Sequence, residues 1–331
     1  MTITSLSAAQ IGALSVTAIQ GLSTTTIASL APTQIAAIST TGIGALSSTQ
    51  VTAITTTQMR ALTTTQIPNF SSDVVFSSNQ LLALNSPQLG VMTTTLVANF
   101  STTAVAALAT SQIQALSATN ISALDATQTA ALTATQISQL TTDQLSVWGT
   151  TQLAALNSAQ LRAIDEADLT TLTTDQWKAL TATQITGLAA SQVAGMDTDD
   201  WAALQGAQVA ALSTAAIAAL TTELGAAWTT TQMGSLTATQ LRAIGTTVLA
   251  ALESDDLNAL TPAQFAAFGT AQVAALTTAQ LTALDDTILA GLTTAQLASI
   301  DATKLATLGT SEFAALSATQ LGALTTAQIV A

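Results

Sequence analysis

The chain has 331 residues, of which 7% are charged and 49% apolar, and its formal net charge is −13. The absence of His and Cys excludes an imidazole general base, a thiol nucleophile, a disulfide and a thiolate metal site. The excess of acids argues against the basic surface that binds nucleic acid. The sequence contains no run of about 18 apolar residues, so it does not predict membrane insertion.

Large apolar residues recur every eight positions, starting in the first run from Leu6 to Leu62. Residues 70–75 form one unit of only six residues, after which the period resumes at Phe76 and continues to Leu324. The consensus unit reads L-[ST]-x-x-Q-[ILV]-x-A. Because repeats override the usual estimate of domain number from length, we predict one continuous array over residues 1–331 with an irregular short repeat at 70–75.

Neither a continuous helix nor a plain strand suits this eight-residue period. In one long helix, eight residues at about 100° each would turn the apolar face by about 80° per repeat, so no single partner could cover it. In a strand, the two large apolar residues of a unit would point to opposite faces, because the spacings between them are odd.

One very short, capped helix per repeat explains every consensus position. Ser or Thr falls at the N-cap and Gln at N3, which is the capping box, as in Thr63–Gln66. The flanking Leu62 and Ile67 then form a hydrophobic staple. Pro32 and Pro262 fall at N1, where proline is favoured. We expect about six or seven helical residues per unit and assign Gln to capping, with a stacked Gln ladder as a second possibility.

An isolated helix of this length is not stable in water, so the units must stack on one another. We therefore predict an all-α fold, a solenoid or superhelix of very short capped helices with one helix per eight-residue repeat. Leu and Ile would point inward, and the caps would lie at the surface. A β-solenoid is the alternative, because Thr is abundant and short apolar runs fit either structure.

Acidic residues gather in three segments, at 165–168, 197–200 and 253–256. Carboxylates at such spacing could bind Ca²⁺. They also fall at N-cap and first-turn positions, where acids stabilise a helix N-terminus, and we prefer this interpretation. We expect no catalytic, cofactor or metal site and no enzyme activity. The four Trp residues take the Leu or Ile positions of the repeat, which predicts that they belong to the core.

The units LTTTQI at 62–67, LTATQI at 180–185 and LTTAQL at 276–281 carry a resemblance to known proteins. They resemble the octapeptide T-x-x-Q-[ILV]-x-A-L arrays of large bacterial surface and secreted repeat proteins, which look like the stalks of type I-secreted adhesins. The resemblance covers nearly the whole chain. It implies a spacer in a giant protein whose activity resides elsewhere.

The repeat pattern and the resemblance together predict a structural or adhesive repeat protein, extracellular or at the cell surface. Its low charge opposes self-association only weakly, so the predicted partner is a second copy, end to end or side by side, in filaments or sheets. A passive spacer and an ice- or polysaccharide-binding surface are the alternatives. The N-terminal sequence lacks the basic and apolar parts of a signal peptide.

Overall fold

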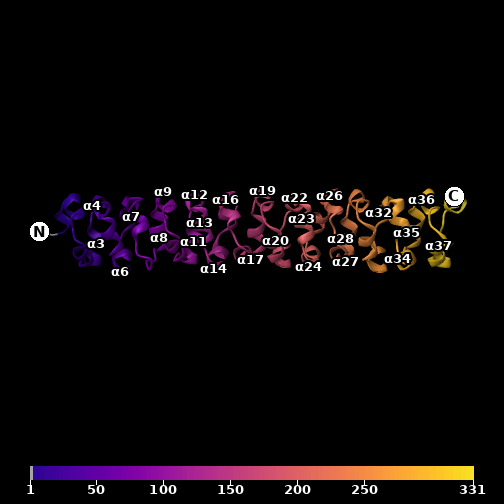
Figure 1. The fold of residues 1–331 in the computed structure, drawn as a ribbon, viewed down its shortest axis with the longest axis horizontal. Coiled ribbons are helices and arrows are strands. Elements are labelled where there is room, and N and C mark those ends of the chain that lie inside the picture. Colours follow the sequence, from indigo (N-terminus) through magenta and orange to yellow (C-terminus); the bar gives the residue numbers. More distant parts are fainter. Residues whose placement is uncertain (1–2) are drawn as a thin grey trace. The chain divides into compact units, whose positions relative to one another are not determined.

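The computed structural model describes residues 3–331, and all the regular secondary structure in this range is helical (Figure 1). The all-α prediction is therefore confirmed, and the β-solenoid alternative is wrong. By their contacts the described residues divide into two compact units, residues 3–156 and 157–331, each of which is described by itself below.

The first unit contains seventeen α-helices and two 3₁₀ helices, η1 and η2. In chain order they are η1 (Ile3–Ser5), α1 (Ala8–Gly12), α2 (Val16–Gln20), α3 (Thr24–Ser29), α4 (Pro32–Ala37), α5 (Thr40–Gly44), α6 (Ser48–Thr52), α7 (Thr56–Ala61), η2 (Ile67–Asn69), α8 (Ser78–Ala83), α9 (Ser86–Gly90), α10 (Thr94–Ala98), α11 (Thr102–Ala107), α12 (Thr110–Ala115), α13 (Ala118–Ser122), α14 (Ala126–Ala131), α15 (Ala134–Ile137), α16 (Thr142–Ser146) and α17 (Thr150–Ala155).

The second unit continues the same pattern of one helix per repeat. In chain order its helices are α18 (Ser158–Arg162), α19 (Glu166–Leu169), α20 (Thr174–Ala179), α21 (Ala182–Ile185), α22 (Ala190–Ala194), α23 (Thr198–Ala203), α24 (Gly206–Ala210), α25 (Thr214–Ala218), α26 (Thr222–Gly225), α27 (Thr230–Gly234), α28 (Ala238–Ala243), α29 (Thr246–Leu249), α30 (Ser254–Asn258), α31 (Pro262–Phe265), α32 (Thr270–Ala275), α33 (Thr278–Thr282), α34 (Asp286–Ala290), α35 (Thr294–Ser299), α36 (Ala302–Leu305), α37 (Thr310–Ala315), α38 (Ala318–Leu321) and α39 (Thr326–Val330).

The predicted capping boxes start many of these helices, and others, such as α12 behind Ala109, keep only the half that the Gln supplies. At α6, the backbone N–H of Gln50 donates to Ser47 Oγ at 3.3 Å, and the Ser47 N–H donates to Gln50 Oε1 at 2.9 Å. The α-helices have four to six residues, fewer than the six or seven expected. The Leu and the following N-cap both adopt extended backbone, as at Leu30 and Ala31, so each repeat leaves the helix for at least two residues.

Within each unit, a helix packs against the third helix before it and the third after it. In the first unit α4 packs against α1 and α7, and in the second α25 packs against α22 and α28. Side-chain hydrogen bonds reach one helix further, from α7 back to α3. One coil of the superhelix therefore takes between three and four repeats.

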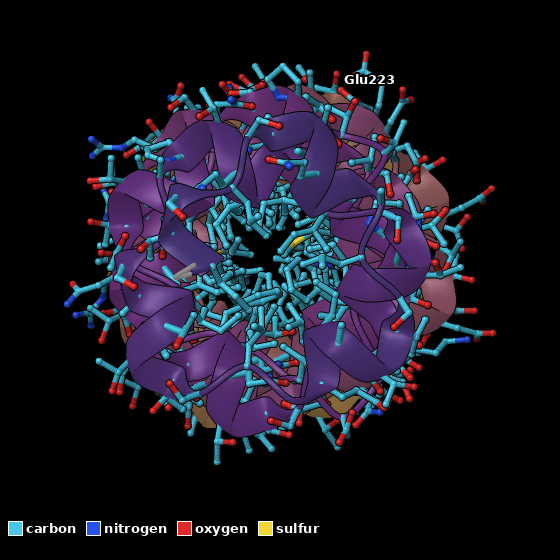
Figure 2. The ribbon with its side chains drawn as sticks, turned by 90° about the vertical axis from the view of Figure 1, so that its left-hand side faces the viewer. Glu223 is labelled. Carbon is cyan, nitrogen blue, oxygen red and sulfur yellow. The ribbon has the colours of Figure 1, made fainter. Side chains whose placement is uncertain are left out.

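The two large apolar positions of the repeat form the core, as expected. Ile35 and Leu30, for example, are buried, and so are Trp148, Trp177, Trp201 and Trp228. Seen end-on in Figure 2, mostly carbon side chains, with a sulfur among them, fill the middle of the coil, and oxygen-bearing side chains lie around the outside, among them Glu223. The prediction of inward Leu and Ile with outward caps is therefore confirmed.

The irregular repeat at 70–75 contains no helix, and η2, with Pro68, lies just before it. Phe70, at its start, and Phe76, directly after its end, are buried with their rings edge to face and the centroids 5.1 Å apart. The Gln80 side chain, in the next repeat, donates to backbone carbonyls 29 and 26 residues earlier. In a regular repeat such as that of Gln58, the corresponding carbonyls lie 31 and 28 residues earlier. The short segment thus takes the place of one full repeat in the coil.

Candidate functional site

The recurring Gln at N3 is the most repeated polar group of the fold, and it uses both ends of its amide. Gln58 Oε1 accepts the N–H of Thr55 at 2.8 Å, which completes the capping box. Its Nε2 donates to the carbonyl oxygens of Ile27 and Leu30, at 2.8 and 2.7 Å. We call this pair of interactions the coil link, since it joins a helix N-terminus to the C-terminal end of a helix about one coil earlier.

The coil link solves a problem that every short helix has. The last carbonyl groups of a helix lack the usual partner four residues later. In α3 the Ile27 carbonyl still accepts the N–H of the C-cap Leu30 at 3.2 Å, so the group that the helix leaves without a partner is the carbonyl of Leu30. Leaving such a buried group unsatisfied costs about 1–3 kcal/mol. One buried amide at Gln58 therefore satisfies the N-terminus of its own helix and the C-terminus of another.

The same register recurs in both units, with acceptors 31 and 28 residues before the Gln. It is found at Gln50, Gln58, Gln66, Gln112, Gln128, Gln136, Gln144, Gln208, Gln232, Gln240, Gln272, Gln280, Gln296, Gln320 and Gln328. The Gln side chains therefore donate to backbone carbonyls of the preceding coil, and not to one another as they would in the Gln ladder considered above.

Two other residue types at N3 form the half of the link that donates to the preceding coil. Asn120 Nδ2 donates to the carbonyl of Met92, 28 residues earlier, at 3.0 Å. Lys304 Nζ donates to the carbonyls of Ala274 and Leu276 at 3.0 and 2.7 Å. The position therefore accepts any side chain that can bring an N–H to these oxygens.

Some helices of the second unit carry an acid at N3. Asp168, Asp200 and Asp256 occupy it and are buried. A carboxylate has no hydrogen to donate to a carbonyl. Burial first, and then the charge of Asp197, raise the pKa of Asp200 to about 6. Burial, followed by the charge of Glu253, raises the pKa of Asp256 to about 6.

The remaining acids of the three acidic segments lie where the capping interpretation puts them. Asp197 is the N-cap of α23 and accepts the Asp200 N–H at 2.7 Å, and Asp165 caps α19 through the Ala167 N–H at 2.9 Å. Glu253 occupies the N-cap of α30 without a side-chain cap bond. Across residues 3–331, no three acidic side chains gather where they could hold a metal ion.

Exposed cap aspartates behave in the opposite way to the buried ones. The Thr127 hydroxyl donates to Asp125 Oδ1 at 2.7 Å, and this bond is the main cause that lowers the pKa of Asp125. The Thr303 hydroxyl lowers the pKa of Asp301 in the same way. The N-cap acids Asp125 and Asp301 are thus held in their charged form, whereas the buried Asp200 and Asp256 at N3 are pushed toward their neutral form.

The repeat pattern predicted capping for the Gln, with a Gln ladder as a second possibility, and did not predict its carbonyl partners in the preceding coil. One signal was available in the repeat itself. Glu serves a capping box as well as Gln does, and its charge favours a helix N-terminus. Yet Gln takes N3 in every capping box of the described residues, and Glu312, which takes N3 of α37, forms no capping box. This bias indicates a need for the N–H donor of the amide.

The surface of the second unit has an open hollow between α34 and α37. It is lined by Asp286, Thr287, Ala290, Ser311, Ala314 and Ala315. Mostly small side chains and a single acid line it, and this set does not form a nucleophile with its base. Among residues 3–331, no helix is both long and apolar enough to cross a membrane.

A family model, the ALTTAQ repeat, matches the chain at residues 27–64, 35–72, 193–230 and 249–286. No curated protein matches the chain. The matched stretches lie in both units and contain the capped helices and coil links described above. The chain is therefore a repeat protein with a helical solenoid architecture, similar over these stretches to the ALTTAQ repeat.

Proposed function

We propose that this chain is a structural component, an array of repeats that carries or spaces what is attached to it, outside the cell or on its surface. The observation that supports the proposal is the coil link. Each link, such as Gln136 to Val105 and Leu108, joins repeats about 30 residues apart and recurs along both units. In a repeat array, stability is approximately a sum of such neighbour interactions, so the array holds itself together along its length.

The use of the polar side chains supports the same proposal. The Ser and Thr hydroxyls at the N-caps accept helix N–H groups, as Thr277 does from Gln280 at 3.1 Å. The Gln amides serve the coil links. The groups that could bind or act on a ligand are thus largely occupied with the fold, as expected for a spacer of the kind found in bacterial adhesin stalks.

The proposal can be tested by holding the whole chain by its two ends in an optical trap. A structural array should resist extension and give way in steps of about one coil, because each coil is linked to its neighbours. Extension without measurable resistance would contradict the structural proposal.

The location can be tested separately, by protease treatment of intact source cells with a cytosolic protein as control. Protection of the chain until the cells are lysed would rule out the surface location.

A second candidate is self-association of copies side by side. Val75, Leu82 and Val91 of the first unit are exposed, at 55%, 42% and 38%, and because a coil takes between three and four repeats they face different sides of it. The first unit carries only three acids and one base, so repulsion between copies is weak.

Sedimentation velocity over a range of concentrations tests this candidate. We expect association that disappears in the V75T/L82Q/V91T variant. The matched control V16T changes an exposed Val in another repeat, and we expect it to associate like the unmodified chain. A monomer at every concentration would rule the candidate out and leave the spacer.

A further inference from the structure

The buried acids at N3 of the second unit have no equivalent in the first unit, where residues 3–156 have no acid at this position. Asp200 and Asp256 are 4% and 3% exposed, as deeply buried as the Gln residues of the coil links. If they follow the register of the coil links, they lie opposite the end of a helix in the preceding coil, where the partners of a link are carbonyl oxygens. Two side chains that can lose a proton therefore stand where the fold needs a donor.

The coil-link register identifies the facing groups. Residues 31 and 28 positions before Asp256 are Gly225 and Trp228, and those before Asp200 are Leu169 and Leu172. The Glu253 backbone hydrogen-bonds to the Asp256 carboxyl group, which corresponds to the capping half of a link. Asp256 Oδ2, which corresponds to the amide nitrogen, is buried and has no partner.

We propose that Asp200 and Asp256 form pH-dependent coil links, which close when the carboxyl group is neutral and open when it is ionised. A neutral carboxyl carries one O–H and can donate it to a carbonyl, whereas a carboxylate is an acceptor only and repels the carbonyl oxygen. Asn120 shows that a side chain of the length of Asp can reach a carbonyl oxygen of the preceding coil, since its Nδ2 lies 3.0 Å from the carbonyl oxygen of Met92.

The charges around the two acids favour the neutral form. Asp197 and Asp199 lie on the same repeat as Asp200, and their charges raise its pKa. Glu253 and Asp255 lie on the repeat of Asp256 and raise its pKa in the same way. The Trp177 indole acts on Asp200 in the opposite direction.

The helices packed against these two repeats bring few basic residues. Helix α23 packs against α20, which bears Asp175 and Lys178, and against α26, which bears Glu223. The facing helix α19 adds Glu166 and Asp168. Helix α30 packs against α27 and α33, which contain no charged residue, and its facing helix is again α26. Lys178, which is exposed, is the one base among these helices and their caps.

The direction of the pH effect follows from the shifts. Both folded-state pKa values, about 6, lie above the ordinary value of 3.8, so between these pH values the folded chain binds more protons than the unfolded chain. The stabilising contribution is fully present below about pH 4. It is lost as the pH rises through about 6, so the second unit loosens near neutral pH.

The test compares thermal unfolding of the whole chain with that of D200N/D256N, followed by circular dichroism at pH 4.5 and pH 8. An Asn amide donates at any pH, as Asn120 does. We expect the variant to melt about 2–4 °C higher per substitution at pH 8 and to match the unmodified chain at pH 4.5. The control variant D143N/D175N removes two exposed first-turn acids and the same charge, and should not remove the fall in melting temperature between pH 4.5 and 8.

A second measurement does not depend on any variant. Carboxyl ¹³C resonances of Asp200 and Asp256 in the unmodified chain should titrate near pH 6. Titration of both near pH 4 would overturn the proposal, as would equal effects of the D200N/D256N and control variants on the melting curves.

Discussion

The two units are built from the same repeat but differ in the residue at the link position. In residues 3–156 this residue is Gln or Asn, or a small or apolar residue, and that unit holds three of the 18 acids. In residues 157–331 it is also Asp in three helices, Lys in α36 and Glu in α37. Yet the apolar positions are buried alike in both units. The apolar core therefore sets the fold, whereas we expect the residue at N3 to adjust how firmly, and at which pH, neighbouring coils are held.

If the core sets the fold, removing core volume should have the largest effect. Trp201 is fully buried and contacts the Trp228 ring, with the centroids 5.2 Å apart. We expect Trp201→Ala to lower the free energy of unfolding by about 3–5 kcal/mol, as large-to-small changes of buried aromatic residues do. Urea titration of the whole chain measures this loss. The exposed Ala202 offers a control, since Ala202→Ser leaves the core intact, and equal losses for the two variants would refute a dominant core.

The next largest effect should come from placing an acid, as found in the second unit, at the N3 position of a helix in the first unit. Gln136 is buried and linked to Val105 and Leu108, so Gln136→Glu places a carboxyl group against two carbonyls. We expect a loss of about 3 kcal/mol at pH 8 and a smaller loss at pH 4.5, where the acid becomes neutral and can donate. Unfolding at the two pH values measures the difference. Gln139→Glu, at an exposed position two residues beyond the same helix, should cost little at either pH.

A third change removes the basic link of the second unit. Lys304→Met keeps the length of the side chain but leaves the carbonyls of Ala274 and Leu276 without their donor. We expect a loss of about 1–3 kcal/mol, and Lys304→Gln should restore the stability because Gln is the usual donor. Hydrogen exchange of the amides in α32 and α33 should locate the loss. Equal stability of the Met and Gln variants would show that the link at this position is dispensable.

The sequence predicted the parts of the fold that depend on neighbouring residues. The capping box between Ser47 and Gln50 spans three residues, so the pattern alone identifies it. The carbonyl partners of Gln50 Nε2 include those of Ile19 and Leu22, 31 and 28 residues earlier, and these separations depend on how many repeats complete a coil. Nothing within one repeat specifies that number. For the same reason the acids at N3 were predicted as first-turn acids, while their burial against another coil was not.

The smallest effect concerns helix starts that lack a side-chain cap. Ala109 precedes α12 and offers no hydroxyl, although Gln112 Oε1 still accepts its N–H at 3.0 Å. The exposed edge there leaves room for a hydroxyl, and Ser117 caps the next helix through the Asn120 N–H at 3.1 Å. Ala109→Ser should therefore raise the free energy of unfolding by about 0.5–1 kcal/mol, and Ser117→Ala should lower it by a similar amount. Urea titrations of both variants measure these changes. Changes in the free energy of unfolding of similar size and opposite sign would show that caps act locally and add to the links. No change for Ala109→Ser would mean that the coil link alone secures the start of α12.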